Sequence, residues 1–389
     1  MFDIVIKNGR VIDFSSQTDE VKTIAIKEGK FVPFNPTEQI RKTIDADGCI
    51  VSPGFVDAHN HLFYGGTGLL STKADISCLP NCVTCACDAG STSIWNFESF
   101  YKTEIVNSLT NIIALLHPCI TGVQLPPTEE IENPDYFNSD EIVQLFKKYP
   151  EILRGLKIRM SKGTAGSFGN APVIKTQEIA EQIRKNGNHC MVTCHYSDLA
   201  DGVTMEEFLG AFKSGDVIAH MYHPDGDSIF NSDGTVMKCV IEAREKGILF
   251  DSSRARINFS MANILKGAKQ GFYPDIMSTD LAKRTLYYKP SFSILWSMSL
   301  FLNVGMPLID ILKAVTYTPA KAFGILDRSG TMEIGKPADV AIIKIIDKKQ
   351  TYADLAGDKI IGDKLIIPMA CIRGGDVVFQ QIFMDDELS

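Results

Sequence analysis

The strongest constraint on the fold is a series of short apolar segments that alternate with helix-like segments through the middle of the chain. The apolar segments are residues 50–58, 83–88, 112–117, 153–159, 190–195, 216–221, 248–251 and 275–280. Each is short enough for a buried strand, and two of the intervening stretches have helix-capping spacing, Asn138 with Glu141 and Thr204 with Glu207. Eight such strands, each followed by a helix, predict an α/β fold, a (β/α)8 TIM-like barrel. A doubly wound open sheet is the alternative, but no GxGxxG pattern follows the early strands.

The two ends of the chain follow a different pattern. Strand-like residues 3–7 and 10–13 flank Asn8-Gly9, and residues 23–27 and 30–32 flank Glu28-Gly29. Both have the spacing of two-residue hairpins, and similar hairpin signals recur after residue 338, around Gly374-Gly375. Because neither end has helical periodicity, we expect one small β-sandwich domain built from residues 1–52 and 330–389, with residues 53–329 forming the barrel.

Composition narrows the class of protein. The 389 residues carry a formal charge of −8, and no run of Lys and Arg is longer than Lys348-Lys349, so we expect no nucleic-acid partner. No apolar stretch is long enough to span a bilayer, and the first residues lack a signal-peptide pattern, so we expect no membrane association. The ten cysteines are too sparse for a disulfide scaffold and lack two CxxC pairs. We therefore expect buried free thiols and a cytoplasmic location.

Metal-ligating side chains fall where the predicted strands end, which is where a barrel of this kind gathers its functional groups. Spacing of two places His59 and His61 on the same side of an extended backbone. Lys157 lies in the apolar frame Gly-Leu-Lys-Ile, where a buried cation is costly. The remaining strand-end residues of this kind are His195, His220 and Asp280. An HxH pair or a lysine alone would indicate little, but together these residues predict a metal site.

The ligand types indicate which metals would bind. Imidazole and carboxylate without thiolate suit zinc best, with manganese, cobalt or iron as alternatives. The histidines and Asp280 can hold two divalent ions, and Lys157 converted by carbon dioxide to N6-carboxylysine would provide an anionic bridging ligand. A water that bridges two such ions loses a proton near neutral pH and becomes a nucleophile. The sequence thus predicts a binuclear hydrolase that acts through attack of a bridging hydroxide, with Asp280 also the catalytic acid–base.

The chain resembles the amidohydrolase superfamily over almost its whole length. The stretches that carry the resemblance are GFVDAHNH (54–61), GLKIRMS (155–161), VTCHYSD (192–198), VIAHMYHP (217–224), DIMSTDL (275–281), TPAKAFGI (318–325) and GTMEIGKPADVAI (330–342). The stretches CDAGSTSIWNF (87–97), SKGTAGSFG (161–169) and PDIMSTDL make it most similar to the dihydroorotase- and hydantoinase-related branch of amidohydrolase/deacetylase metallohydrolases. By position, the resemblance implies one ion held by His59, His61 and Asp280, a second ion held by His195 and His220, and carboxylated Lys157 between them.

Two stretches depart from that branch. After the seventh strand the branch usually has Phe-Asp-Val-Gly-His-Gly, whereas residues 250–256 of this chain read FDSSRAR and include Arg254 and Arg256. The position three residues past His220, usually Asn in the branch, is His223. We expect these side chains to bind substrate, and the planar fork of arginine favours a carboxylate. A structural salt bridge with a nearby aspartate is the alternative role for each arginine.

Together these features predict a metal-dependent hydrolase that cleaves an amide, cyclic amide or ester bond of a small, carboxylate-bearing substrate. One alternative is a mononuclear deaminase of a nucleobase-like ring, which would leave Lys157 unmodified. Another is a catalytically silent scaffold of the same fold, which the complete set of ligands disfavours. Besides the small-molecule substrate, we expect further copies of the chain as partners in a homo-oligomer.

Overall fold

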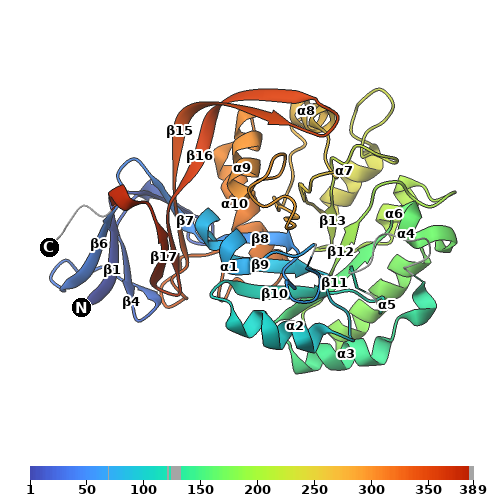
Figure 1. Cartoon of the computed structure of the whole chain (residues 1–389), viewed down its shortest axis with the longest axis horizontal. Helices are drawn as coiled ribbons and strands as arrows, with labels where there is room; N and C mark the ends of the chain where they lie inside the picture. The colour runs from blue at the N-terminus through green and yellow to red at the C-terminus, as the bar shows by residue number, and fades with distance from the viewer. Residues whose placement is uncertain (69, 121, 124–132, 385–389) are drawn as a thin grey trace.

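A β sandwich built from both ends of the chain lies beside a larger barrel (Figure 1). The structure is a computed structural model that describes residues 1–68, 70–120, 122–123 and 133–384, so residues 385–389 of the predicted β domain lie outside the described part. The four-stranded sheet of the sandwich has the order β5-β4-β1-β6, with β1 Phe2–Lys7, β4 Ile24–Lys27, β5 Lys30–Val32 and β6 Ile40–Asp45. The six-stranded sheet has the order β17-β16-β15-β7-β2-β3, with β2 Arg10–Asp13, β3 Thr18–Val21, β7 Ile50–Pro53, β15 Val340–Ala353, β16 Lys359–Arg373 and β17 Asp376–Gln380.

The turns of the sandwich confirm one predicted hairpin at the start of the chain and correct the other. Strands β4 and β5 pair in antiparallel fashion around Glu28 and Gly29, whose φ values of 52° and 72° suit a type I′ turn. Strands β1 and β2 do not pair: β1 pairs with β4 and β6, and β2 pairs with β3 and β7. Asn8-Gly9 therefore carries the chain from one sheet to the other. Gly9 passes so close to the six-stranded sheet that a Cβ there would lie 2.5 Å from a Val51 methyl group.

The predicted barrel is confirmed, with two of its strands altered. Its seven-stranded parallel sheet runs in chain order, with β8 Phe55–Asn60, β9 Val83–Ala89, β10 Asn111–Leu116, β11 Leu153–Arg159, β12 Met191–His195, β13 Val217–Ala219 and β14 Leu249–Phe250. The first predicted strand, residues 50–58, is divided at Gly54 into β7 of the sandwich and β8 of the barrel. A Cβ at Gly54 would lie 2.2 Å from the Thr84 hydroxyl oxygen, so the two sheets meet there at close range.

The eighth predicted strand is an extended segment instead of a regular strand. It closes the ring through a bridge from Ile276 to Asp251, next to β14, and a bridge from Leu281 to Asn60 of β8. Side-chain carboxylates take over part of its hydrogen bonding, since Ser278 N donates to Asp251 at 3.1 Å and Thr279 N donates to Asp57 at 3.1 Å. The segment therefore departs from a regular ladder because the site itself binds its backbone.

Helices cover the outside of the barrel (Figure 1). They are α1 Ala74–Ser77, α2 Phe97–Thr103, α3 Ser139–Lys148, α4 Lys162–Ala165, α5 Ala171–Lys185, α6 Met205–Gly210, α7 Lys238–Glu245, α8 Met261–Lys269, α9 Ile294–Asn303, α10 Leu308–Val315 and α11 Tyr317–Ala322. Short 3-10 turns span Leu79–Asn81, Ile105–Asn107, Pro134–Tyr136, Gly166–Phe168 and Ile382–Met384. Both predicted caps are present: the Asn138 side chain accepts from Glu141 N, and Thr204 and Glu207 form a reciprocal capping box.

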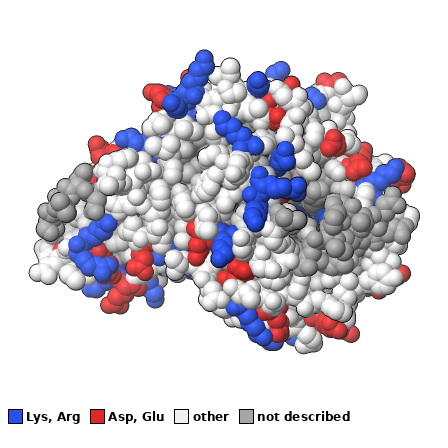
Figure 2. Space-filling view, in the orientation of Figure 1, with Lys and Arg blue, Asp and Glu red and all other residues white. Residues whose placement is uncertain are grey.

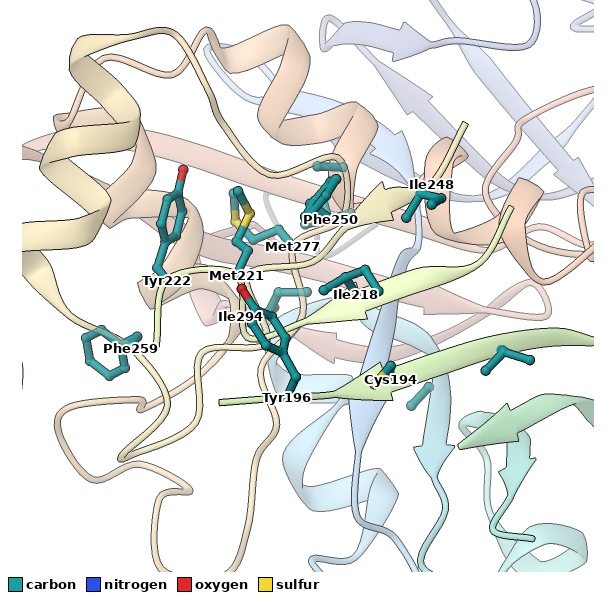
Figure 3. Close-up of a cluster of buried hydrophobic side chains, with 14 of the residues drawn as sticks. Cys194, Tyr196, Ile218, Met221, Tyr222, Ile248, Phe250, Phe259, Met277 and Ile294 are labelled. Atoms are coloured by element: carbon teal, nitrogen blue, oxygen red, sulfur yellow. The ribbon is translucent and has the colours of Figure 1, made fainter. Parts of the chain in front are cut away.

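Apolar side chains pack tightly between the barrel strands and the elements around them (Figure 3). Ile218 of β13 and Phe250 of β14 are fully buried there, next to Met277 of the eighth segment. The cysteines follow the prediction, since all ten lie in the described residues, no disulfide joins any of them, and all but Cys239 are buried. This packing holds the strand ends in fixed positions, which the site requires.

The long hairpin of β15 and β16 joins the sandwich to the barrel by leaving the sandwich and running over the barrel helices (Figure 1). The Tyr352 ring of β15 packs on the Trp296 ring of α9 with centroids 4.7 Å apart. Asp354 accepts a hydrogen bond of 2.8 Å from Met261 N at the start of α8. The two parts of the chain therefore share packed contacts through this hairpin.

Basic and acidic side chains are mixed on the surface of the sandwich (Figure 2), whereas Asp13 and Asp339 are buried. Arg10 pairs with Asp19 at 2.7 Å, and Lys27 pairs with Glu38 at 2.9 Å. In the described residues, no helix has both the length and the apolar character needed to cross a membrane.

Candidate metal centre

The first barrel strand and the eighth segment bring three predicted ligands together. His59 lies in β8, His61 follows that strand directly, and Asp280 lies in the closing segment. Asp280 Oδ1 is 3.2 Å from His61 Nε2 and 3.7 Å from His59 Nε2. One ligand atom from each of the three side chains lies within 4.8 Å of the others, and His59 and His61 are buried. This spacing allows all three to bind one ion.

Lys157 points into the same space from the middle of β11. Its side chain is only 2% exposed, and Nζ lies 3.3 Å from His59 Nε2. Gly90 leaves the room that the lysine needs, because a Cβ at this residue would lie 2.8 Å from both Cβ and Cγ of Lys157. Burial lowers the pKa of Lys157 to about 8, although the nearby Asp280 charge acts in the opposite direction.

The remaining two histidines approach from the neighbouring strands. His195 is the last residue of β12, and His220 follows β13 directly. Their ring centroids are 4.3 Å apart, and His220 Nε2 lies 3.7 Å from Asp280 Oδ2. His220 Nε2 is buried and has no hydrogen-bond partner in the described part of the chain, as expected for a nitrogen that would bind an ion. The structure thus gathers every residue of the predicted ligand set at one end of the barrel.

The surroundings of the site set the protonation states of three of the histidines and of Asp280. It lowers the pKa of His59 and His195 well below the usual range, and it lowers the pKa of His220 to about 3. Burial acts to raise the pKa of Asp280, but the hydrogen bond with His61 and the surrounding charges outweigh it, so this pKa is lowered. At neutral pH the site therefore presents His59, His195 and His220 as neutral imidazoles and Asp280 as an ionised carboxylate, nitrogen and oxygen donors that suit zinc.

Serine side chains and backbone hold the Nδ1 atoms of the histidines on the side away from Asp280. His61 Nδ1 lies 2.9 Å from Ser91 Oγ, and Ser91 N in turn donates to Asp88 at 2.8 Å. Asp88 also accepts from Leu62 N at 2.8 Å, so it fixes the loop that follows β8. Both Asp88 and Ser91 lie in the stretch CDAGSTSIWNF (87–97), which at the level of sequence contributes only to the family resemblance.

Ser253 makes the corresponding contacts with two histidines. Its hydroxyl oxygen lies 3.2 Å from His59 Nδ1, and its carbonyl oxygen accepts from His220 Nδ1 at 2.8 Å. Sequence reasoning assigned this stretch to the substrate and missed the contact, because a serine after a strand carries no metal-site signal of its own.

Two further features fix the positions of the site residues: a hydrogen bond of Asp57 and a strained backbone at three residues. The Asp57 side chain accepts from Thr279 Oγ1 at 2.7 Å, which ties β8 to the segment that carries Asp280. His220, Ser253 and Asp280 have φ values of 62°, 34° and 48°, a left-handed region that non-glycine residues seldom occupy. Such strain concentrates at functional sites, where the surrounding structure enforces it.

The three residues predicted to bind substrate differ in burial and in the contacts they make. Arg254 is 1% exposed, its guanidinium donates to Pro290 O, and it lies over the Phe259 ring. Arg256, two residues later, is exposed. His223 is buried with its ring edge-on to Tyr196, at a centroid distance of 4.7 Å. In the described residues no carboxylate pairs with Arg254, and its Nε and Nη1 atoms have no hydrogen-bond partner.

Comparison with known sequences gives a family match over most of the chain. The sequence pattern of the amidohydrolase family matches residues 50–363. A deacetylase from Agrobacterium fabrum is 28% identical over 339 residues, which cover 86% of this chain and 80% of that protein. A deacetylase from Enterococcus faecalis is 26% identical over 380 residues, covering 97% of this chain and 99% of the other.

Solved structures share the fold over nearly the full length. The crystal structure of an adenine deaminase has a TM-score of 0.88 at 24% identity and covers 98% of this chain and 100% of its own. The crystal structure of a dihydroorotase has a TM-score of 0.82 at 24% identity. The match covers 97% of this chain and 99% of the dihydroorotase chain. Both structural matches include the barrel and the β sandwich.

Proposed function

The chain belongs to the amidohydrolase family, and from that premise we propose that it hydrolyses an amide, cyclic amide or ester bond of a small acid at a centre of two divalent ions. The observation that carries the proposal is the buried cluster of imidazoles, one carboxylate and one amine at the end of the barrel. Charged and metal-ligating groups are seldom buried together unless an ion compensates them.

The ligand set divides between two positions. His59, His61 and Asp280 would hold one ion, and His195 and His220 the other, with zinc the best match to these donors. When bound, two such ions lower the pKa of the attacking water and polarise the carbonyl group of the substrate.

Lys157 would join the two positions as N6-carboxylysine. Its neutral amine would attack carbon dioxide, forming a nitrogen–carbon bond and releasing one proton, so the product is an anionic carbamate. The lowered pKa of Lys157 favours the neutral amine that this reaction needs, and the 3.3 Å approach of Nζ to His59 Nε2 supports a role beside the ligands. The modification would also replace a buried cation by the negative charge that two dications require.

Asp280 would move the proton. Its two carboxylate oxygens face different histidines, with Oδ1 toward His61 and Oδ2 toward His220, so it reaches the middle of the cluster. Its lowered pKa keeps it ionised at neutral pH, ready to accept a proton from the attacking water. It would then deliver that proton to the leaving nitrogen or oxygen of the substrate, as a general acid–base does.

Arg254 supports a carboxylate on the substrate. A buried guanidinium with two N–H-bearing nitrogens unpartnered in the described structure is suited to a planar anion, and Arg254 directly follows the serine that contacts His59 and His220. Burial lowers the pKa of Arg254 to about 9, so it stays charged at neutral pH. His223 would offer a further polar contact, whereas the exposure of Arg256 gives that residue less support. Acylated amino or hydroxy acids and carboxylated cyclic amides fit this description.

The specific alternative is a mononuclear deaminase of a nucleobase-like ring. It is favoured by the cluster of His59, His61 and Asp280, which could hold a single ion without the other ligands. The solved adenine deaminase shares the fold with this chain. A cytoplasmic location and a homo-oligomeric state stay predictions from the sequence.

A substrate screen tests the proposal against the alternative. Zinc-supplemented protein would be assayed with N-acetyl amino acids, O-acetyl hydroxy acids and carboxylated cyclic amides, each beside its neutral analogue, and with nucleobases. We expect hydrolysis of acids in at least one of the first three groups, abolished by a chelator and restored by zinc. Release of ammonia from a nucleobase, without hydrolysis of any acid, would support the deaminase instead.

A further inference from the structure

Ser253 occupies a backbone conformation that disfavours its own side chain. It is fully buried directly after Asp251 and Ser252, and its φ is 34°. Glycine adopts positive φ without steric cost, whereas a residue with a Cβ is strained there. A serine that remains in this conformation needs a compensating interaction for its hydroxyl group.

The hydrogen bonds of Asp251 determine where the Ser253 hydroxyl proton goes. The Asp251 carboxylate accepts from Ser253 N at 3.0 Å, Ser253 Oγ at 2.5 Å, Ser278 N at 3.1 Å and Ser278 Oγ at 2.6 Å. All four partners can donate, so the carboxylate serves as acceptor throughout. The 2.5 Å contact with Asp251 takes the only hydroxyl proton of Ser253, so the Ser253 oxygen accepts in its two longer contacts, with Ser278 Oγ and with His59 Nδ1, both at 3.2 Å.

The acceptor oxygen faces His59. Since Ser253 Oγ is 3.2 Å from His59 Nδ1 and its own proton is already directed to Asp251, the proton of this contact must come from Nδ1. The carbonyl oxygen of Ser253 can only accept, so His220 Nδ1 also carries a proton in its 2.8 Å contact. In both neutral rings Nε2 then keeps its lone pair, and both Nε2 atoms lie 3.7 Å from an Asp280 oxygen.

We propose that Ser253 is a positioning residue that sets the tautomer and orientation of His59 through its hydroxyl group and of His220 through its carbonyl group. The inference rests on the proposed metal centre, in which these histidines belong to different ions. Hydrogen bonds of this kind, from the outer nitrogen of a ligating histidine, orient the ring and tune the affinity for the metal. One strained residue thereby couples the two halves of the ligand set.

The two roles of Ser253 can be separated by substitution. Ser253→Gly keeps the carbonyl contact with His220, removes the hydroxyl contacts with His59 and Asp251, and relieves the backbone strain. Ser253→Ala removes the same hydroxyl but retains a Cβ at positive φ. Ser252→Ala is a matched control, because the Ser252 hydroxyl is buried in the same loop and has no hydrogen-bond partner among the described residues.

The experiment measures zinc affinity by competition with a chelator, zinc content per chain, and the thermal midpoint of metal-free protein. We expect Ser253→Gly and Ser253→Ala to bind one of two ions about 10- to 100-fold more weakly. Ser252→Ala should leave both affinities unchanged. In the metal-free state Ser253→Gly should be as stable as the wild type or more stable, which a merely structural role would not produce. The absorption spectrum of cobalt-substituted protein should also change in Ser253→Gly.

These measurements distinguish a failure of the positioning role from a failure of the proposed metal centre. If wild-type protein binds two ions and Ser253→Gly binds both with wild-type affinity, the positioning role is wrong and the metal centre stands. If Ser253→Gly loses metal-free stability along with affinity, the serine is structural and the inference is again overturned. If wild-type protein binds no divalent ion, the proposed function fails and the inference fails with it.

Discussion

The β sandwich and the strand-end site of the barrel are both built on apolar strands, but their charged side chains differ in exposure, as one ion pair and two site residues show. In the sandwich, Arg10 and Asp19 form an ion pair with side chains 47% and 41% exposed. In the barrel, Lys157 is 2% exposed and Asp280 is 9% exposed. Exposed pairs contribute little to stability, whereas buried charges are costly unless a partner compensates them. Because buried charges destabilise a fold unless a partner compensates them, this difference supports the proposal that the barrel charges serve binding and chemistry.

Backbone strain separates the two regions in the same way. In the sandwich, the positive φ values of Glu28 and Gly29 lie in a hairpin turn whose geometry requires them. In the barrel, His220 directly follows β13 and Asp280 lies in the closing segment, and both have positive φ values outside any hairpin. Strain of this kind persists only where surrounding contacts enforce it, and here those contacts converge on the site.

The largest expected effect of any substitution is at Lys157. Lys157→Ala should remove most of the bound metal and reduce activity by more than about 10³-fold, because the ions supply several kcal/mol of transition-state stabilisation. Metal analysis and steady-state kinetics measure both losses. Added short-chain carboxylate should restore part of each by replacing the carbamate. A free Lys157 amine in metal-loaded, active protein, seen by carbon-13 spectroscopy, would refute the bridging role.

Asp280→Asn should have the next largest effect, on turnover more than on metal content. Asparagine still offers an oxygen to a metal but cannot take up the proton, so kcat should fall by about two to four orders of magnitude. Circular dichroism and the thermal midpoint should show an intact fold. Near-wild-type turnover would mean that another group moves the proton, with His223 the first to examine.

A smaller effect is expected from Arg254→Met, and only for some substrates. Losing hydrogen bonds between charged groups should raise KM by about 10-fold or more for acidic substrates and much less for their neutral analogues. The comparison of KM across matched substrate pairs is the measurement. An equal change for both kinds of substrate would show that Arg254 supports the loops that carry Phe259 and Pro290 instead of binding substrate.

The smallest effect should come from the sandwich. Arg10→Ala should change the free energy of unfolding by less than about 1 kcal/mol and leave kcat and metal content unaltered. Chemical denaturation and kinetics on the same preparation check both statements. A substantial loss of activity would contradict the separation of roles between the two regions.

Much of this architecture can be predicted from the sequence because apolar periodicity is a local signal. This periodicity predicts the alternating strands of the barrel. Two other local signals, capping spacing and hairpin spacing, predict the capped helices at Asn138 and Thr204 and the sandwich built from both ends. The residues gathered at the strand ends are also predictable, because topology brings strand ends together whatever the loops do.

Other features depend on contacts between distant residues and could not be predicted. Asn8-Gly9 has the sequence of a hairpin turn, yet β1 and β2 pair with other strands because each completes a different sheet. The eighth segment departs from a regular strand because Asp57 and Asp251 bind its backbone. The role of Ser253 becomes visible only when His59 and His220, far apart in sequence, are placed beside it.

We propose that the buried cluster holds two ions, and the number of ions bound per chain of purified protein tests this proposal. Protein prepared with zinc and bicarbonate, freed of loosely bound metal, should contain two zinc ions per chain by elemental analysis. One ion per chain would contradict the two-ion centre and favour the mononuclear alternative. No bound ion would contradict the proposed function altogether.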